Sequence, residues 1–197
     1  MVTIIVTGFG KFGDVIDNPT THLAKHLTED PHANSTTVLE VSAEGVRAAM
    51  QPMWDEAEAS TETTVFVHFG VKRRATTIEL EQVGYNIADF RMPDERGWVA
   101  QAEVIDATEG DSLQTHLPLD EILAACQAQG CNNMSISTDP GRYICNYTYF
   151  LSLVHAKKRA TKNQYALFVH VPPFSVISEN EQLEAVQTLL AVLHKSL

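Results

Sequence analysis

Residues 134–149 read MSISTDPGRYICNYTY, and the order of patterns in this stretch decides the fold class. A short apolar run, 134–137, stops at an Asp-Pro-Gly sequence at 139–141, and these residue types favour tight turns. A helical pattern follows at once, with aromatic and aliphatic residues on one face. The stretch therefore predicts a strand, a turn and a helix, with Cys145 in the first turn of that helix.

The position of Cys145 makes it a candidate nucleophile. Unpaired backbone N–H groups and the helix dipole favour a thiolate at the start of a helix. A cysteine among aromatic residues can instead be a small core residue. Strand-turn-helix junctions are, however, where α/β folds place nucleophiles. We therefore expect a catalytic thiol, which needs a base.

Strand-like runs and helical patterns alternate along the rest of the chain. The strands are expected at 3–7, 37–41, 65–69, 77–83, 134–137 and 166–171, and the helices at 19–27, 44–59, 119–129, 145–158 and 180–193. This order predicts one α/β domain over 1–197, with a mixed or mostly parallel sheet covered on both faces. The polar stretch 86–98 is expected to be a long loop or hairpin over the sheet.

Composition excludes several classes of function. The formal net charge is −11, and lysine and arginine gather only at 72–74 and 157–159, which we interpret as solvated ends of elements. Binding to nucleic acid or to an anionic membrane is therefore disfavoured. The three cysteines are odd in number and form no CxxC, which indicates a reducing compartment. With no signal-peptide pattern and no apolar run of spanning length, we expect a cytoplasmic protein.

A histidine and a carboxylate could complete the site. His170 lies near the end of a predicted buried strand and should project toward its carboxyl edge. If the strand 134–137 runs parallel, the cysteine helix begins at that same edge. His68 occupies a similar strand end and remains a rival, and either histidine could instead be structural. Glu79 and Glu81 alternate on one strand and share a face, so either could orient an imidazole.

The loop after the first strand matches GxGxxG literally at 8–13. Its third glycine lies outside the next helix, which should begin around Asn18, and the second strand ends without a well-placed acidic residue for a ribose. A nucleotide-dependent oxidoreductase is therefore a weaker alternative. The loop is better interpreted as a wall that presents Phe9 and Phe12. The histidines and carboxylates show no metal-ligand spacing, so we expect neither a metal nor a cofactor.

Several blocks, in this order, resemble the pyroglutamyl peptidase I family, the pyrrolidone-carboxylate peptidases. They are 7–13 with Asn18 and Pro19, Glu81 with Asn86, the pattern Asp89-x-Arg91-x-Pro93-Asp94 with Gly97, the pattern Asp139-x-Gly141-Arg142-Tyr143-x-Cys145-Asn146, and the pattern Phe168-x-His170-Val171-Pro172. The resemblance covers nearly the whole chain. It implies an α/β/α sandwich and removal of N-terminal pyroglutamate from peptides by a cysteine peptidase.

The resemblance also implies residue roles. Cys145 matches the nucleophile, His170 the acid/base and Glu81 the residue that orients the histidine. Phe9 and Phe12 match aromatic residues of the lactam pocket.

Further positions near the pocket follow the family less closely. Val71 stands near the pocket where many bacterial members have glutamine, and Arg91 is expected to assist at the developing oxyanion. Pro140 replaces an alanine and Glu95 an asparagine. These departures leave room for a non-catalytic binder of peptides with blocked N-termini. The oligomeric state stays open.

Overall fold

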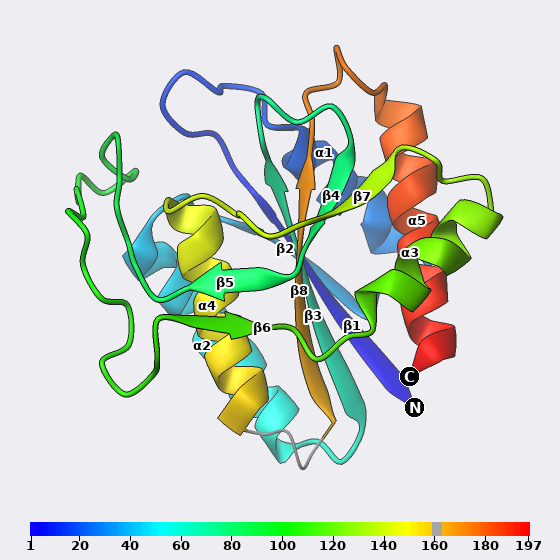
Figure 1. The fold of residues 1–197 in the computed structure, drawn as a ribbon, viewed down its shortest axis with the longest axis horizontal. Coiled ribbons are helices and arrows are strands. Elements are labelled where there is room, and N and C mark those ends of the chain that lie inside the picture. Colours follow the sequence, from blue (N-terminus) through cyan, green and yellow to red (C-terminus); the bar gives the residue numbers. More distant parts are fainter. Residues whose placement is uncertain (159–162) are drawn as a thin grey trace.

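A six-stranded sheet forms the centre of the computed structural model, which describes residues 1–158 and 163–197 (Figure 1). The strand order is β2-β1-β3-β8-β4-β7. Four strands run in one direction: β1 (Val2–Phe9), β2 (Ser35–Leu39), β3 (Thr63–Val71) and β8 (Gln164–Val171). The other two, β4 (Ile78–Glu81) and β7 (Met134–Ser137), are parallel to each other and antiparallel to β8. The predicted mixed, mostly parallel sheet is confirmed.

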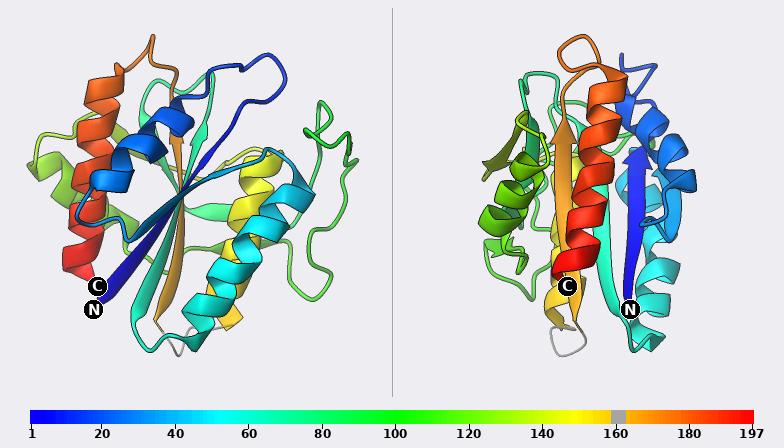
Figure 2. Two further views of the ribbon diagram at one scale, coloured as in Figure 1. Left: turned by 180° about the vertical axis from the view of Figure 1, so that it is seen from behind. Right: turned by 90° about the vertical axis from the view of Figure 1, so that its right-hand side faces the viewer.

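Helices cover both faces of this sheet (Figure 2). One face carries α1 (Pro19–His26), α3 (Leu119–Ala128) and α5 (Glu179–Ser196), and a short 3₁₀ turn, Leu27–Glu29, follows α1. The other face carries α2 (Ala43–Ala59) and α4 (Ile144–Lys158). Two separate apolar clusters fill the spaces between the layers. The fold is thus the α/β/α sandwich that the resemblance implies.

Strand alternation explains how β3 serves both clusters. Val65, Val67 and Phe69 face α1 and α5, whereas Phe66 faces α2 and α4. All four side chains are fully buried. This placement leaves Gly70 on the α2/α4 side near the carboxyl end of the strand, where the candidate site lies.

The run predicted as one strand over 77–83 is two strands in different sheets. β4 ends at Glu81, and β5 (Val83–Tyr85) pairs with β6 (Ser112–Gln114), a strand missed in the sequence. Gln82 lies between them: its N–H donates to Ser137, and its C=O accepts from Thr115. The chain turns here because β5 packs over α4, where a side chain on Gly84 would crowd Leu153.

The long loop expected over 86–98 extends further, over residues 86–111, and is held by buried polar side chains. The Asn86 side-chain oxygen accepts from the N–H groups of Ile105 and Asp106, and Asp94 accepts from the N–H groups of Arg96 and Trp98. The loop therefore has its own internal order without regular secondary structure.

Among the described residues, no helix combines the length and the apolar character needed to cross a bilayer. Of the basic run at 157–159, Lys157 pairs with Glu109 at 2.6 Å and Lys158 lies 3.7 Å from Asp106. Arg159 lies outside the described residues.

Candidate active site

Gly70, Cys145 and His170 lie together near the carboxyl ends of β3 and β8. Gly70 and His170 are register partners on these parallel strands. A Cβ atom added to Gly70 would come within 2.9 Å of Cys145 Sγ and 2.7 Å of Phe168 Cζ. Cys145 is the second residue of α4, so the thiol lies in the first turn of the helix, as expected. The structure brings the predicted nucleophile and base to one place.

Glu81 is joined to His170 by a short, buried hydrogen bond. Glu81 Oε1 lies 2.7 Å from His170 Nδ1, and Glu81 is fully buried. An ionised carboxylate only accepts, so Nδ1 must carry the proton. That tautomer leaves the lone pair of Nε2 to accept a proton, as a general base requires. Of the two candidate carboxylates, Glu81 is the one that contacts the imidazole.

His68 has a different environment from His170. Its ring is fully buried, with Nδ1 2.7 Å from Thr7 Oγ1 and Nε2 2.9 Å from Ser152 Oγ. Burial lowers the pKa of His68 to about 3. Both ring nitrogens are engaged by hydroxyl groups, so His68 is a neutral structural histidine inside the α2/α4 face.

The chain reaches Cys145 by a different route from the one expected. Strand 134–137 runs antiparallel to β8, so the parallel arrangement considered in the sequence is wrong. Residues 138–143 instead cross back over the sheet to the start of α4 (Figure 1). Asp139 Oδ1 accepts the N–H of Gly141 at 3.1 Å, and Gly141 adopts φ +76°, a conformation that suits glycine. Pro140 is buried in this turn and fixes its path.

Burial raises the pKa of the Cys145 thiol to about 12, and the negative charge of Glu81 acts in the same direction. The Cys145 backbone N–H and the positive charge of Lys72 lower the pKa but do not outweigh these effects. The helix start alone therefore does not hold a thiolate, contrary to the simple expectation from sequence. The thiol needs a neighbouring base to take its proton.

Aromatic rings surround the reactive groups. The Phe12 ring lies 6.1 Å from the Tyr143 ring, between the loop after β1 and the segment before α4. Phe9 is only 2% exposed and packs on Phe168 at 6.3 Å, and Phe168 in turn contacts the His170 ring at 4.7 Å. Phe12 can therefore line a ligand pocket directly, whereas Phe9 supports it from behind.

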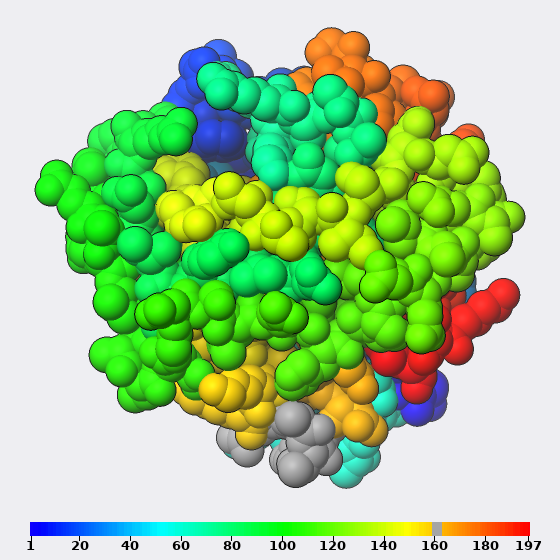
Figure 3. Space-filling view, in the orientation of Figure 1, coloured from blue at the N-terminus to red at the C-terminus, as the bar shows by residue number. Residues whose placement is uncertain are grey.

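A groove of about 520 Å³ borders the segment that leads to Cys145. Its walls come from the long loop and the 139–143 turn: Asp89, Arg91, Met92, Asp139, Gly141, Arg142 and Tyr143. Figure 3 shows a hollow where the blue loop after β1 meets the yellow segment before α4. Arg91 thus lies beside the candidate site. Val71 lines a groove together with Ile16 and Phe174.

Lys72 and Glu95 make contacts near the site that the sequence did not predict. Lys72, read there as a solvated residue, contacts Glu79 at 2.5 Å and lies 3.6 Å from Glu81. Its pairing could have been suspected from the opposite charges that flank one short turn. Glu95 accepts the N–H of Gly13 and so ties the loop after β1 to the long loop.

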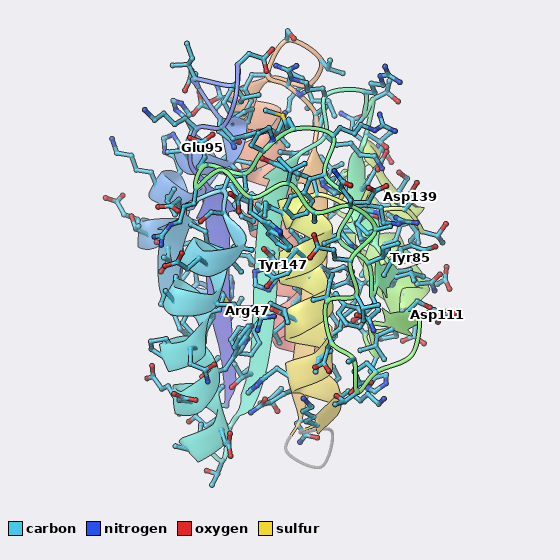
Figure 4. The ribbon with its side chains drawn as sticks, turned by 90° about the vertical axis from the view of Figure 1, so that its left-hand side faces the viewer. Arg47, Tyr85, Glu95, Asp111, Asp139 and Tyr147 are labelled. Atoms are coloured by element: carbon cyan, nitrogen blue, oxygen red, sulfur yellow. The ribbon has the colours of Figure 1, made fainter. Side chains whose placement is uncertain are left out.

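The segment before α4 is also held from its outer side. The Arg142 guanidinium lies 3.8 Å from the centre of the Tyr85 ring and bonds Asp139 at 2.7 Å. In Figure 4, Tyr85 and Asp139 lie on the side of α4 that faces away from α2, whereas Arg47 and Tyr147 meet between α2 and α4. These contacts fix the approach to the nucleophile.

The glycine-rich loop packs strand against helix. A Cβ on Gly8 would lie 2.3 Å from the Thr20 carbonyl oxygen, and the Thr20 and Thr21 hydroxyls bond to Phe9. Asn18 caps α1, so Gly13 lies outside the first helical turn. Within 1–158 and 163–197, no three His, Cys, Asp or Glu side chains gather as a metal site.

Comparison with known proteins gives relatives over almost the entire length. The chain is 25% identical to rat pyroglutamyl-peptidase 1 over 98% of this chain and 92% of that protein. It is 28% identical to the pyrrolidone-carboxylate peptidase of Thermococcus litoralis over 87% of this chain and 77% of the relative.

Solved structures similar to this one come from the same kind of protein. The pyrrolidone carboxyl peptidase of Thermococcus litoralis superposes with a TM-score of 0.85 at 25% identity, covering 100% of this chain and 97% of that one. The enzyme of Fervidobacterium islandicum gives 0.86 at 24% identity over 99% of both chains, a likeness of fold. The pyroglutamyl peptidase family model matches residues 2–193. The protein therefore belongs to the pyroglutamyl peptidase family.

Proposed function

We propose that this protein hydrolyses the amide bond after an N-terminal pyroglutamyl residue, with Cys145, His170 and Glu81 as its catalytic triad. The observation that carries this proposal is the 2.7 Å bond between buried Glu81 and His170, next to the Cys145 thiol. Family membership supports the substrate class. Peptides with a pyroglutamyl N-terminus are then the partners of this site.

The first half of the reaction forms a thioester. His170 Nε2 takes the Cys145 proton as the sulfur attacks the amide carbonyl, and the resulting imidazolium is stabilised by Glu81. The unpaired N–H groups at the start of α4 face the developing oxyanion, and Arg91 can assist. Collapse of the tetrahedral species breaks the C–N bond, and His170 returns its proton to the leaving amine.

The second half releases the acid. Water attacks the thioester while His170 accepts its proton, and the proton then returns to the departing Cys145 sulfur. Pyroglutamate leaves, and the thiol and neutral imidazole are restored. No external oxidant or reductant takes part.

The surroundings suit a small neutral ring. A lactam has no charge, so its pocket needs apolar walls and a few hydrogen bonds. Phe12 and Tyr143 supply flat aromatic surfaces, and Met92 lies against Gly13 at the edge of the same region.

A direct test is hydrolysis of a pyroglutamyl-fluorophore amide under reducing conditions. We expect turnover by the parent protein, loss after treatment with iodoacetamide, and a fall of ~10³-fold or more in Cys145→Ala. Cys131→Ser is the matched control, because Cys131 is the other partly exposed cysteine and lies away from the site.

Two results would contradict the proposal. One is a parent protein that binds the amide without turning it over, which would indicate a non-catalytic binder. The other is full activity in Cys145→Ala. Alanyl-fluorophore amide checks selectivity, since equal turnover of both amides would refute a lactam pocket.

A further inference from the structure

Lys72 touches all three segments that carry the triad. Its Nζ lies 2.5 Å from Glu79 and 3.6 Å from Glu81 on β4. The same ammonium donates to the Asp139 carbonyl at 3.0 Å, in the turn that leads to Cys145. The Lys72 backbone N–H donates to Val171, the neighbour of His170, at 2.9 Å. One residue thus links the carboxylate strand, the histidine strand and the approach to the nucleophile.

The charge of Lys72 is held close to the buried carboxylate. The Lys72 side chain is one-third exposed, and the carboxylates around it raise its pKa despite the opposing effect of burial, so it stays cationic at neutral pH. Glu81 Oε2 has no hydrogen-bond partner within the described residues. Burying a carboxylate with an unpaired oxygen is costly unless a positive charge lies nearby. Lys72 supplies that charge when His170 is neutral.

We propose that Lys72 is a positioning residue of the catalytic site: its ammonium holds the Glu81 carboxylate in line with His170 and favours loss of the Cys145 proton. Glu79 regulates this effect, because it competes with Glu81 for the same ammonium. The catalytic meaning of the assignment rests on the proposed peptidase function. The electrostatic relationship itself does not need a substrate.

Other charged and titratable groups surround the Lys72 ammonium. They are Glu79 and Glu81 on β4, Asp139 and Arg142 in the turn before α4, Tyr143, Cys145 and Tyr149 on or beside α4, and His170 on β8. Arg142 bonds Asp139 directly, so that charge is largely neutralised locally. Burial raises the pKa of both tyrosines, so they stay neutral. Lys72 is therefore the cation whose loss changes the charge balance at Glu81.

The test is the pH dependence of Cys145 alkylation by iodoacetamide, followed by mass spectrometry of the peptide that contains Cys145. This readout reports thiolate formation and excludes Cys126 and Cys131. In Lys72→Met, we expect the midpoint of the pH profile of Cys145 alkylation to move to higher pH by about 0.5–1 unit. In Glu79→Gln, the ammonium is no longer shared, and the midpoint moves to lower pH. A merely structural role would not give shifts of opposite sign.

Two further variants serve as controls. Arg74→Met removes the same charge from an exposed residue of the same turn, and its midpoint should match that of the parent. Lys72→Arg keeps a cation and should restore most of the parent profile. If Lys72→Met does not fold, the Glu79→Gln shift still decides: an unchanged or raised midpoint overturns the proposal.

Activity assays separate this inference from the proposed function. For an active parent, kcat/KM of Lys72→Met should fall about tenfold near neutral pH and recover partly at higher pH. An unshifted alkylation profile in Lys72→Met, or an equal shift in Arg74→Met, overturns the role of Lys72 whether or not the parent hydrolyses the amide. Opposite shifts in an inactive parent would support Lys72 and refute only the peptidase function.

Discussion

Gly70 and His170 are register partners on β3 and β8, and the missing side chain of Gly70 is the space that the Cys145 sulfur borders. The Phe168 ring borders the other side of this space. Neither the Cys145 sulfur nor the Phe168 ring can therefore move away easily. The position of the Cys145 sulfur therefore depends on residue 70 being glycine, because a Cβ atom there would crowd it.

Gly70→Ala should displace the Cys145 sulfur and lower kcat/KM at least tenfold, since small misplacements of reacting groups are costly. The assay is hydrolysis of the pyroglutamyl amide, with circular dichroism to confirm folding. Gly110→Ala is the control, because a Cβ there meets nothing within 4 Å. Equal activity in both variants would show that the contact at Gly70 is unimportant.

The two neighbouring glutamates should differ sharply. Glu81→Gln keeps the shape of the side chain but loses the charge that stabilises protonated His170, so kcat should fall by ~10³-fold or more. Glu79→Gln leaves the 2.7 Å Glu81–His170 bond in place and should change kcat by less than about tenfold. The measurement is kcat at the pH optimum of each variant. Similar losses in both would indicate that Glu79 can replace Glu81.

Glu95→Gln should weaken the link between the loop after β1 and the long loop. Glu95 accepts the Gly13 N–H at 3.1 Å in an exposed position, and such a bond contributes about 1 kcal/mol or less. We expect KM to rise up to about fivefold with little change in kcat, because Phe12 belongs to the tethered loop. Glu103→Gln is the exposed control on the long loop, and a KM change of the same size there would contradict the link.

His68 should make stability depend on pH. Its pKa is about 3 in the folded protein, below the ordinary value of 6.5, so the unfolded chain binds more protons between these values. The contribution of neutral His68 to the free energy of unfolding is present above pH 6.5. It is lost as pH falls, by up to about 1.4 kcal/mol per pH unit.

Urea unfolding at about pH 7, 6 and 5 measures this slope, and the range lies above the titration of most carboxylates. His68→Gln removes the titrating group while keeping polar atoms near Thr7 and Ser152. We expect a lower stability at pH 7 and a flatter slope in the variant. An unchanged slope would assign the pH dependence to other groups.

Much of the fold follows from local patterns. The five predicted helices begin and end within a few residues of their expected bounds. The strand 134–137 has its predicted bounds. Its direction was not predictable, because a short apolar run has the same pattern in either orientation. The direction depends on pairing with β4, which local sequence does not encode.

The residues of the candidate site could be predicted only in part from the sequence. Motif order pointed to Cys145, His170 and Glu81, and the structure brings all three side chains together. The placement of Val71 and Lys72 was hard to predict for one shared reason: strand alternation near the end of β3 sends side chains to opposite faces, and the turn after it reverses toward β4. Where a side chain points in such a turn depends on contacts that are distant in sequence.

The small antiparallel part of the sheet has a consequence for how activity is lost. His170 stands on the large parallel part, whereas Glu81 stands on β4, next to the four-residue edge strand β7. Short edge strands open more readily than the centre of a sheet. Separation of β4 from β8 would disconnect the acid from the histidine while most of the molecule remained folded. The proposed activity therefore depends on the contact between β4 and β8, and inactivation can precede denaturation.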